Sequence, residues 1–242
     1  MSLLSFFAMM ISVTRSSWIA LAVASIFGII YIIKNFNKDI LKRTIILASC
    51  FTIIFIFVLK PPTFIENIIC NYKYSNFIDD RFKSLYNDFD NIVNNENLNS
   101  VGSGRLEIWY LTLKLTSQVP LLGTGPDTLK DGIIYKLPLD ALNYFYERNA
   151  IFDKAHNEYL QIAATIGIPA LIIYLAFLMQ ILFNQKNLFK NSGLFILIIP
   201  IIAYITQAFF NISTIGVAPV FWFLLGVIQN KIFVKDIEAE DT

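Results

Sequence analysis

About six apolar segments divide this chain of 242 residues and restrict its fold. A helix that crosses the hydrocarbon core of a bilayer needs about 20 predominantly apolar residues. In lipid every backbone amide must be hydrogen-bonded internally, so we expect these segments to be transmembrane helices. They cover residues 3–13, 18–33, 44–59, 159–183, 193–210 and 217–228.

The composition agrees with a membrane protein. Hydrophobic residues make up 56% of the chain and charged residues only 15%, with a mean hydropathy of +0.59, whereas soluble domains carry about 25% charged residues. This deficit and the net charge of +1 exclude a disordered chain and a nucleic-acid binder with a basic face. One histidine and two cysteines, Cys50 and Cys70, offer no metal site and no disulfide framework, so we expect no metal and no cofactor.

Lysine and arginine in short loops predict the orientation, because they accumulate on the cytoplasmic side. They cluster after the second, fourth and sixth apolar segments, so all three clusters lie on one side. The large loop at 61–155, which holds twelve of the 18 acidic residues and nine of the 19 basic ones, then lies outside the cytoplasm. The prediction is an all-α integral membrane protein with helices one to three (1–60), a partly helical extracytoplasmic loop (61–155), helices four to six (156–230) and a cytoplasmic tail (231–242).

The extracytoplasmic loop has a pattern of its own. A helix is expected at 81–89, and the stretch after Ser103 has the spacing of an amphipathic helix, with Ser103 as its N-cap. The apolar positions of that second helix are Leu106, Trp109, Tyr110, Leu113 and Leu115. Glycine and proline punctuate residues 120–127 and predict a turn. A less ordered stretch is expected to reach Asp153, the predicted N-cap of a helix through His156 into the fourth span.

Three polar residues at the ends of predicted helices have competing explanations. Arg15, between the first two spans, has either a functional partner or a snorkelling role at the membrane interface. Arg105 opposes the dipole of its helix, which suits either an anion bound at the helix N-terminus or an ion pair, for instance with Glu107. His156 either takes a proton near neutral pH or caps the span as a polar interface residue.

Two pairs of amides lie four residues apart. Asn157 and Gln161 share a helix face, where they either bond a sugar hydroxyl or hold neighbouring helices together. Gln207 and Asn211 repeat this spacing near the end of the fifth span, where contacts between helices are the favoured interpretation.

In the predicted topology Arg15, Arg105 and His156 all lie at the outer face of the membrane. Two fixed cations and one titratable base fit a lipid-linked pyrophosphate with a hydroxyl acceptor. The arginines would hold the pyrophosphate and stabilise its charge as it leaves, and the histidine would take the acceptor proton.

Four short blocks of the sequence resemble the O-antigen ligase and polymerase superfamily. They are Thr14-Arg15-Ser16, Gly-Ser-Gly-Arg-Leu-Glu-Ile-Trp at 102–109, Pro-Leu-Leu-Gly-Thr-Gly-Pro at 120–126, and Ala-His-Asn-Glu-Tyr-Leu-Gln at 155–161. The blocks stand in the family's order, with a long outer loop between the corresponding spans. The resemblance covers nearly the whole chain and corresponds to the C-terminal half of the family's membrane domain. The start of the sequence lacks the basic region of a secretory signal, so we expect a fragment or short form of a longer multi-span protein.

The resemblance implies a glycosyltransferase of the bacterial inner (plasma) membrane. Such a protein takes a glycan from undecaprenyl pyrophosphate outside the cytoplasm and transfers it to a hydroxyl of a glycan or lipid-glycan acceptor, without a metal and with inversion. The resemblance assigns Arg15 and Arg105 to the donor pyrophosphate and His156 to acceptor activation. Trp109, Gly123 and Gly125 match positions that look structural. Ligase and polymerase remain alternatives, and the residues within the blocks favour an enzyme that makes a surface polysaccharide of a Gram-positive cell.

Two other classes of protein remain open. A membrane transporter would carry ionisable residues deep in several spans, and these segments contain essentially none. A partial or inactive chain would need an N-terminal partner.

Overall fold

A computed structural model describes residues 6, 14–35, 37–59, 83–84, 86–88, 90–91, 93–94, 102, 104–184 and 192–230. Within these residues the secondary structure is helical and contains no strand, which confirms the all-α class. The predicted first span, apart from Phe6, and the predicted cytoplasmic tail lie outside the described residues, as does most of the stretch from 60 to 101.

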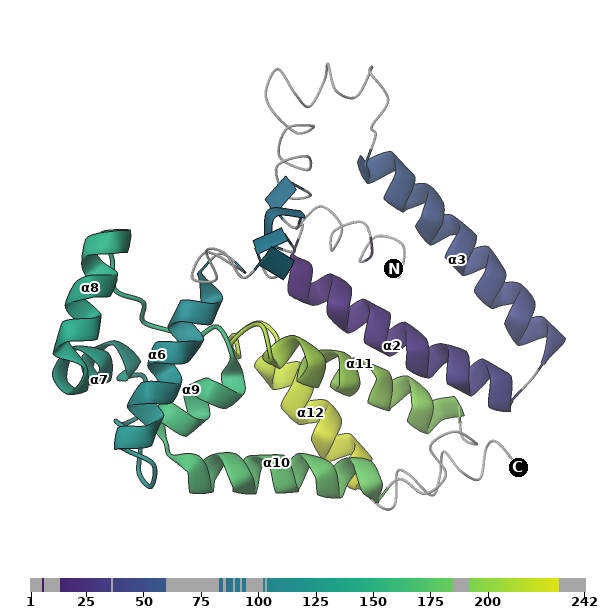
Figure 1. The fold of residues 1–242 in the computed structure, drawn as a ribbon. Coiled ribbons are helices and arrows are strands. Elements are labelled where there is room, and N and C mark those ends of the chain that lie inside the picture. Colours follow the sequence, from purple (N-terminus) through teal and green to yellow (C-terminus); the bar gives the residue numbers. More distant parts are fainter. Residues whose placement is uncertain are drawn as a thin grey trace.

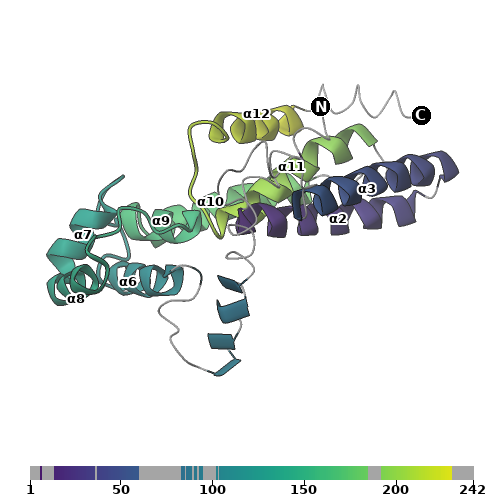
Figure 2. The same cartoon turned by 90° about the horizontal axis from the view of Figure 1, so that it is seen from above.

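The helices form two groups (Figures 1 and 2). The long apolar group consists of α2 (Arg15–Lys34), α3 (Lys38–Leu59), α10 (Ile168–Phe183), α11 (Ser192–Ala208) and α12 (Ala218–Gln229). The second group consists of α6 (Arg105–Gln118), α7 (Leu129–Lys136), α8 (Pro138–Arg148) and α9 (Glu158–Thr165). Both views place the second group together at one end of the apolar helices.

The predicted fourth span, 159–183, is not one helix. It divides into α9 and α10 at Gly167, whose φ of 110° is outside the helical range. A Cβ atom at this position would lie 2.2 Å from the carbonyl oxygen of Leu121. The close approach of the 120–127 turn therefore requires glycine at this position, and Pro169 in the first turn of α10 cannot continue the hydrogen bonding of α9.

The number of membrane spans stays a prediction. By length and composition one helix in the described part of the chain, Ser16–Lys34 with 19 residues, could cross a membrane. The apolar helices Ile168–Phe183, Gly193–Ala208 and Ala218–Gln229 are shorter than the usual length of a span.

Among the apolar helices, α11 contacts α2 and α12, and α10 contacts α12. The core between α10, α11 and α12 consists of Leu178, Ile181, Ile198, Ile201, Phe221, Leu225 and Ile228. A second core lies under the other group, where α6 contacts α7 and α9. Helix α9 contacts α6 on one side and α10 on the other, so it connects the two groups.

Helix α6 is confirmed, but two details of its prediction are wrong. Its N-cap is Gly104 (φ 80°) and not Ser103. The buried face carries Ile108, Leu111 and Leu115, whereas the predicted Tyr110 is 63% exposed. Both faces of this helix are apolar in sequence, so periodicity could not show which of them meets the neighbouring helices.

The stretch between the turn and Asp153 is also more ordered than expected, because it forms α7 and α8. Helix α7 has only 8 residues, too few to display a clear helical period. Its Leu129 and Ile133 are fully buried in the second core, so tertiary packing stabilises a helix that the local pattern does not reveal.

Candidate active site

The predicted turn at 120–127 is confirmed, and it is bonded into the break between α9 and α10. The amides of Thr124 and Gly125 donate to the carbonyls of Ala164 (3.1 Å) and Thr165 (2.8 Å). A Cβ atom on Gly123 would lie 2.3 Å from the carbonyl carbon of Thr165. The residue at 123 must therefore be glycine for the turn to lie against the helix end.

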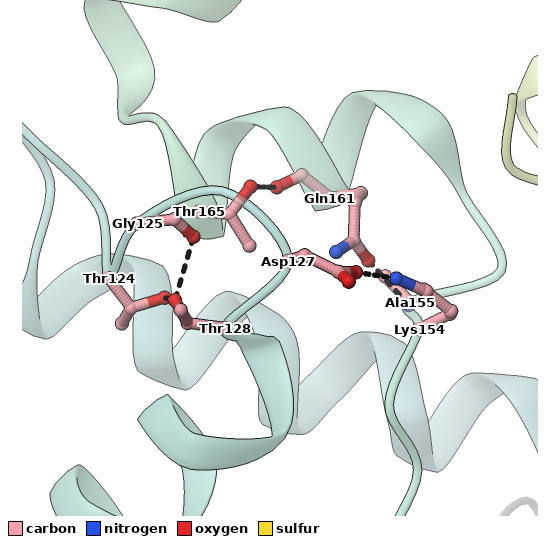
Figure 3. A network of polar contacts seen from close by, with 8 residues as sticks. All are labelled: Thr124, Gly125, Asp127, Thr128, Lys154, Ala155, Gln161 and Thr165. Atoms are coloured by element: carbon pink, nitrogen blue, oxygen red, sulfur yellow. Dashed lines mark hydrogen bonds and ion pairs between the residues drawn. The ribbon is translucent and has the colours of Figure 1, made fainter.

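The segment before α9 lies on the other side of this turn (Figure 3). Lys154 forms an ion pair with Asp127 of the turn, and the amide of Ala155 donates to Gln161 Oε1 at 2.8 Å. Asp127 has a φ of 61°, in the left-handed region. One loop is thus attached both to the turn and to the helix that follows it.

The predicted helix from Asp153 through His156 does not form. Helix α9 begins at Glu158, and its N-cap is Asn157, whose Oδ1 accepts a hydrogen bond from Leu160 N at 3.0 Å. Asn157 has extended backbone angles that suit a cap, and its short amide reaches the third helical residue. His156 consequently precedes the helix.

His156 has a φ of 49°, a left-handed conformation that costs a residue other than glycine roughly 1–3 kcal/mol. Burial lowers the pKa of its imidazole below the ordinary value of ~6.5, and the charge of Arg105 lowers this pKa further. The carboxylate of Asp153 acts in the opposite direction. The two larger effects favour the neutral imidazole, and the structure brings His156 close enough to Arg105 for the charge of the guanidinium to act on it.

Arg105 is the first residue of α6, and a second cation lies near it. Arg148, at the end of α8, donates from Nη2 to Glu107 Oε2 at 3.0 Å. A Cβ atom on Gly104 would lie 3.5 Å from the guanidinium of Arg148. Sequence reasoning proposed Glu107 as a partner for Arg105 and missed Arg148, because no local pattern connects the end of α8 to the start of α6.

Arg15 is the first residue of α2, and the C-terminal end of α11 contacts both α2 and α9 through single hydrogen bonds. Gln207 Nε2 donates to Ser17 Oγ of α2 at 3.5 Å, which supports the interpretation of Gln207 as a contact between helices. The Tyr159 hydroxyl of α9 donates to the carbonyl of Ile205 at 2.8 Å.

The same end of α11 also reaches α6. The ring of Trp109 lies 6.3 Å from that of Phe210, measured between centroids. The residues at and just after the end of α11 thus contact Ser17 of α2, Trp109 of α6 and Tyr159 of α9.

Glu158 is a buried acid that sequence reasoning did not select. Only 9% of its surface is exposed, and its carboxylate accepts hydrogen bonds from the hydroxyls of Tyr174 and Tyr204, both at 3.0 Å. The signal in the sequence was an acidic residue at the start of an apolar run. In the described part of the chain no three acidic, histidine or cysteine side chains gather to hold a metal ion.

A family model described as O-antigen ligase matches residues 1–175. The chain belongs to the O-antigen ligase family. The match spans α2, α6 and α9 and includes Arg15, Arg105 and His156, and it confirms the resemblance of the four sequence blocks. No curated protein and no solved structure matches the chain.

Membership of the O-antigen ligase family establishes a coarse function. The family consists of integral proteins of the bacterial inner membrane, with glycosyltransferase activity of the ligase or polymerase type in polysaccharide biosynthesis. Lipid-linked glycans are the substrates of this family, so the chain is a membrane glycosyltransferase of that type.

Proposed function

We propose that the protein transfers or polymerises glycan from an undecaprenyl-pyrophosphate donor onto a hydroxyl acceptor, on the outer side of the membrane, in surface polysaccharide biosynthesis. The observation that supports this most directly is the juxtaposition of Arg105 with His156, whose pKa is lowered by burial and by the charge of Arg105. A neutral imidazole accepts a proton, and a guanidinium beside it binds phosphate.

In the proposed reaction His156 is the general base. It takes the proton of the acceptor hydroxyl while the oxygen forms a bond to the anomeric carbon of the donor sugar. The bond between that carbon and the pyrophosphate oxygen breaks, and the electron pair leaves with undecaprenyl pyrophosphate. Attack from the opposite face inverts the anomeric centre. The side chains supply the base and the positive charge, so the proposed step uses no metal.

Arg105 and Arg15 bind the departing pyrophosphate in this proposal. Arg15 begins α2, and the positive end of the helix dipole favours an anion at this place. The first turn of α2 contains no acidic residue, and the buried hydroxyl of Ser16 has no hydrogen-bond partner among the described residues.

Asn157 and Gln161 are proposed to bind substrate through their amide nitrogens. The oxygen of Asn157 caps α9, and the oxygen of Gln161 accepts from Ala155. Their NH₂ groups can still donate to a sugar hydroxyl or a phosphate. In this proposal the oxygen atoms of the two amides hold the loop that contains His156, and their nitrogen atoms contact the ligand.

The test is a transfer assay with membrane vesicles that contain the chain. The vesicles receive an undecaprenyl-pyrophosphate-linked glycan, an acceptor glycan and a metal chelator. The proposal predicts an elongated acceptor and one released undecaprenyl pyrophosphate per transfer. Consumption of donor without an elongated acceptor, or no consumption at all, would overturn it.

A further inference from the structure

A small polar cavity lies between α9 and the end of α11. Its volume is about 30 Å³, enough for a single water-sized group. The polar residues that line it are Glu158, Tyr204, Gln207, Asn211 and Thr214. A sugar ring does not fit into this space, but one hydroxyl or hydroxymethyl group does.

The carboxylate of Glu158 has capacity left for a ligand in this cavity. An ionised carboxylate offers about four acceptor positions. The hydroxyls of Tyr174 and Tyr204 use one position on each oxygen. A buried acid is costly unless it is hydrogen-bonded, so a hydroxyl donor that enters the cavity would be bound strongly.

The cavity adjoins the start of α9 and the end of α11. Glu158 follows His156 by two residues on one side. On the other side Gln207 donates a hydrogen bond to Ser17, in the first turn of the helix that Arg15 begins. A sugar with one substituent in the cavity would therefore lie at the start of α9, which directly follows the loop that carries His156.

We propose that Glu158 and this cavity bind one hydroxyl of the acceptor sugar and so determine which neighbouring hydroxyl faces His156. Glu158 is then a specificity-determining residue that touches substrate. The inference rests on the proposed function, since it requires a sugar acceptor at His156. Beyond the proposed function, the inference names Glu158 as the residue that selects the acceptor hydroxyl.

The experiment measures kcat/KM for transfer to the parent acceptor and to acceptors that each lack one hydroxyl. The full chain is compared with Glu158→Ala, Glu158→Gln and Thr214→Val. For the unmodified chain we expect one deoxy acceptor to react at least about tenfold more slowly than the parent, because the carboxylate then lacks a donor. Glu158→Ala should transfer to both acceptors at the same, lower rate.

Controls separate binding from folding. Tyr174 bonds to Glu158, but Tyr174→Phe leaves the polar lining intact, so it should retain the discrimination even if it unfolds at lower temperature. Thr214 is exposed in the loop before α12, so Thr214→Val should fold normally and weaken the discrimination.

A series of deoxy donors shows whether the hydroxyl in the cavity belongs to the acceptor sugar or to the donor sugar. Discrimination that depends on Glu158 in the donor series, or equal discrimination in Glu158→Ala and the unmodified chain, would overturn the inference while leaving the proposed function intact. The inference would also be overturned if Thr214→Val discriminated between the parent and deoxy acceptors as strongly as the unmodified chain does. Failure of the unmodified chain to elongate the parent acceptor would instead overturn the proposed function, and the inference with it.

Discussion

The guanidinium of Arg105, at the start of α6, lies close enough to His156, just before α9, for its charge to lower the pKa of the imidazole. The two residues stand far apart in the sequence. Contacts of α6 with α9 bring them together, and the turn at 120–127 fixes the far end of α9.

The pKa of His156 is the first prediction. It is the only histidine of the chain, so its NMR signals can be assigned without ambiguity in detergent-solubilised protein. The folded chain should titrate below ~6.5. Arg105→Met removes a charge that lowers the pKa and should raise it, while Asp153→Asn removes a charge that raises the pKa and should lower it further. Shifts in the reverse directions would refute the assigned neighbours.

The pH dependence of transfer follows from the same shift. The base is active when neutral, so activity should be constant above the lowered pKa and decline as the pH falls through it. Arg105→Lys keeps the charge, so the acidic limb should stay near its original position. The rate itself should fall at least about tenfold, because an ammonium cannot reproduce the planar fork of a guanidinium. An unchanged rate would show that Arg105 does not bind the donor.

The junction of the turn with the helix break predicts a large effect on stability. A side chain at position 167 would meet the carbonyl of Leu121, so Gly167→Ala should destabilise the protein by roughly 1–3 kcal/mol or more. Gly226→Ala is the matched control, because it lies within α12 with nothing within 4 Å of an added Cβ atom. It should be neutral or stabilising by up to ~1 kcal/mol. Thermal unfolding in detergent compares the two, and equal midpoints would contradict the packing described.

The ion pair of Lys154 with Asp127 should act on catalysis more than on stability. Asp127 is largely exposed, and exposed ion pairs contribute about 0–1 kcal/mol. Lys154→Gln and Asp127→Asn should each slow transfer several-fold, because the loop that holds His156 loses its attachment to the turn. The double variant should be no slower than either single one. Additive losses would indicate that the two side chains act separately.

The orientation is tested by cysteine labelling in intact cells, after Cys50 and Cys70 have been replaced by alanine. Tyr135 is 82% exposed on α7, in the group of helices assigned to the outer face. Tyr135→Cys should react with a membrane-impermeant thiol reagent, and Lys38→Cys at the start of α3 should react only after the cells are opened. The reverse pattern would invert the topology.

The sequence predicted the helices that depend on long apolar runs, because composition alone determines them. The prediction missed the division of the fourth apolar segment, although Gly167 and Pro169 are local signals of a helix break. What the sequence could not show is that Leu121, in a distant turn, lies against Gly167. It placed His156 inside a helix because Asp153 and Asn157 are both good N-caps, and only the packed structure selects Asn157.

The candidate site was predictable as residue types and not as geometry. Arg105 and His156 were selected as charged or titratable groups beside apolar segments. Glu158 also stands beside an apolar segment but was not selected, because its burial depends on two tyrosines that α10 and α11 bring to it. Neither partner is local in sequence, and no spacing rule connects them.

The most direct test of the central claim is transfer by a variant of His156 that still binds donor. His156→Asn is suited to this, because asparagine tolerates the left-handed backbone at this position. His156→Ala provides a second side chain without a base. The account predicts that both variants remain in the membrane, bind the undecaprenyl-pyrophosphate-linked glycan as the unmodified chain does, and produce no detectable elongated acceptor. Elongation at the rate of the unmodified chain would contradict the assignment of His156 as the base.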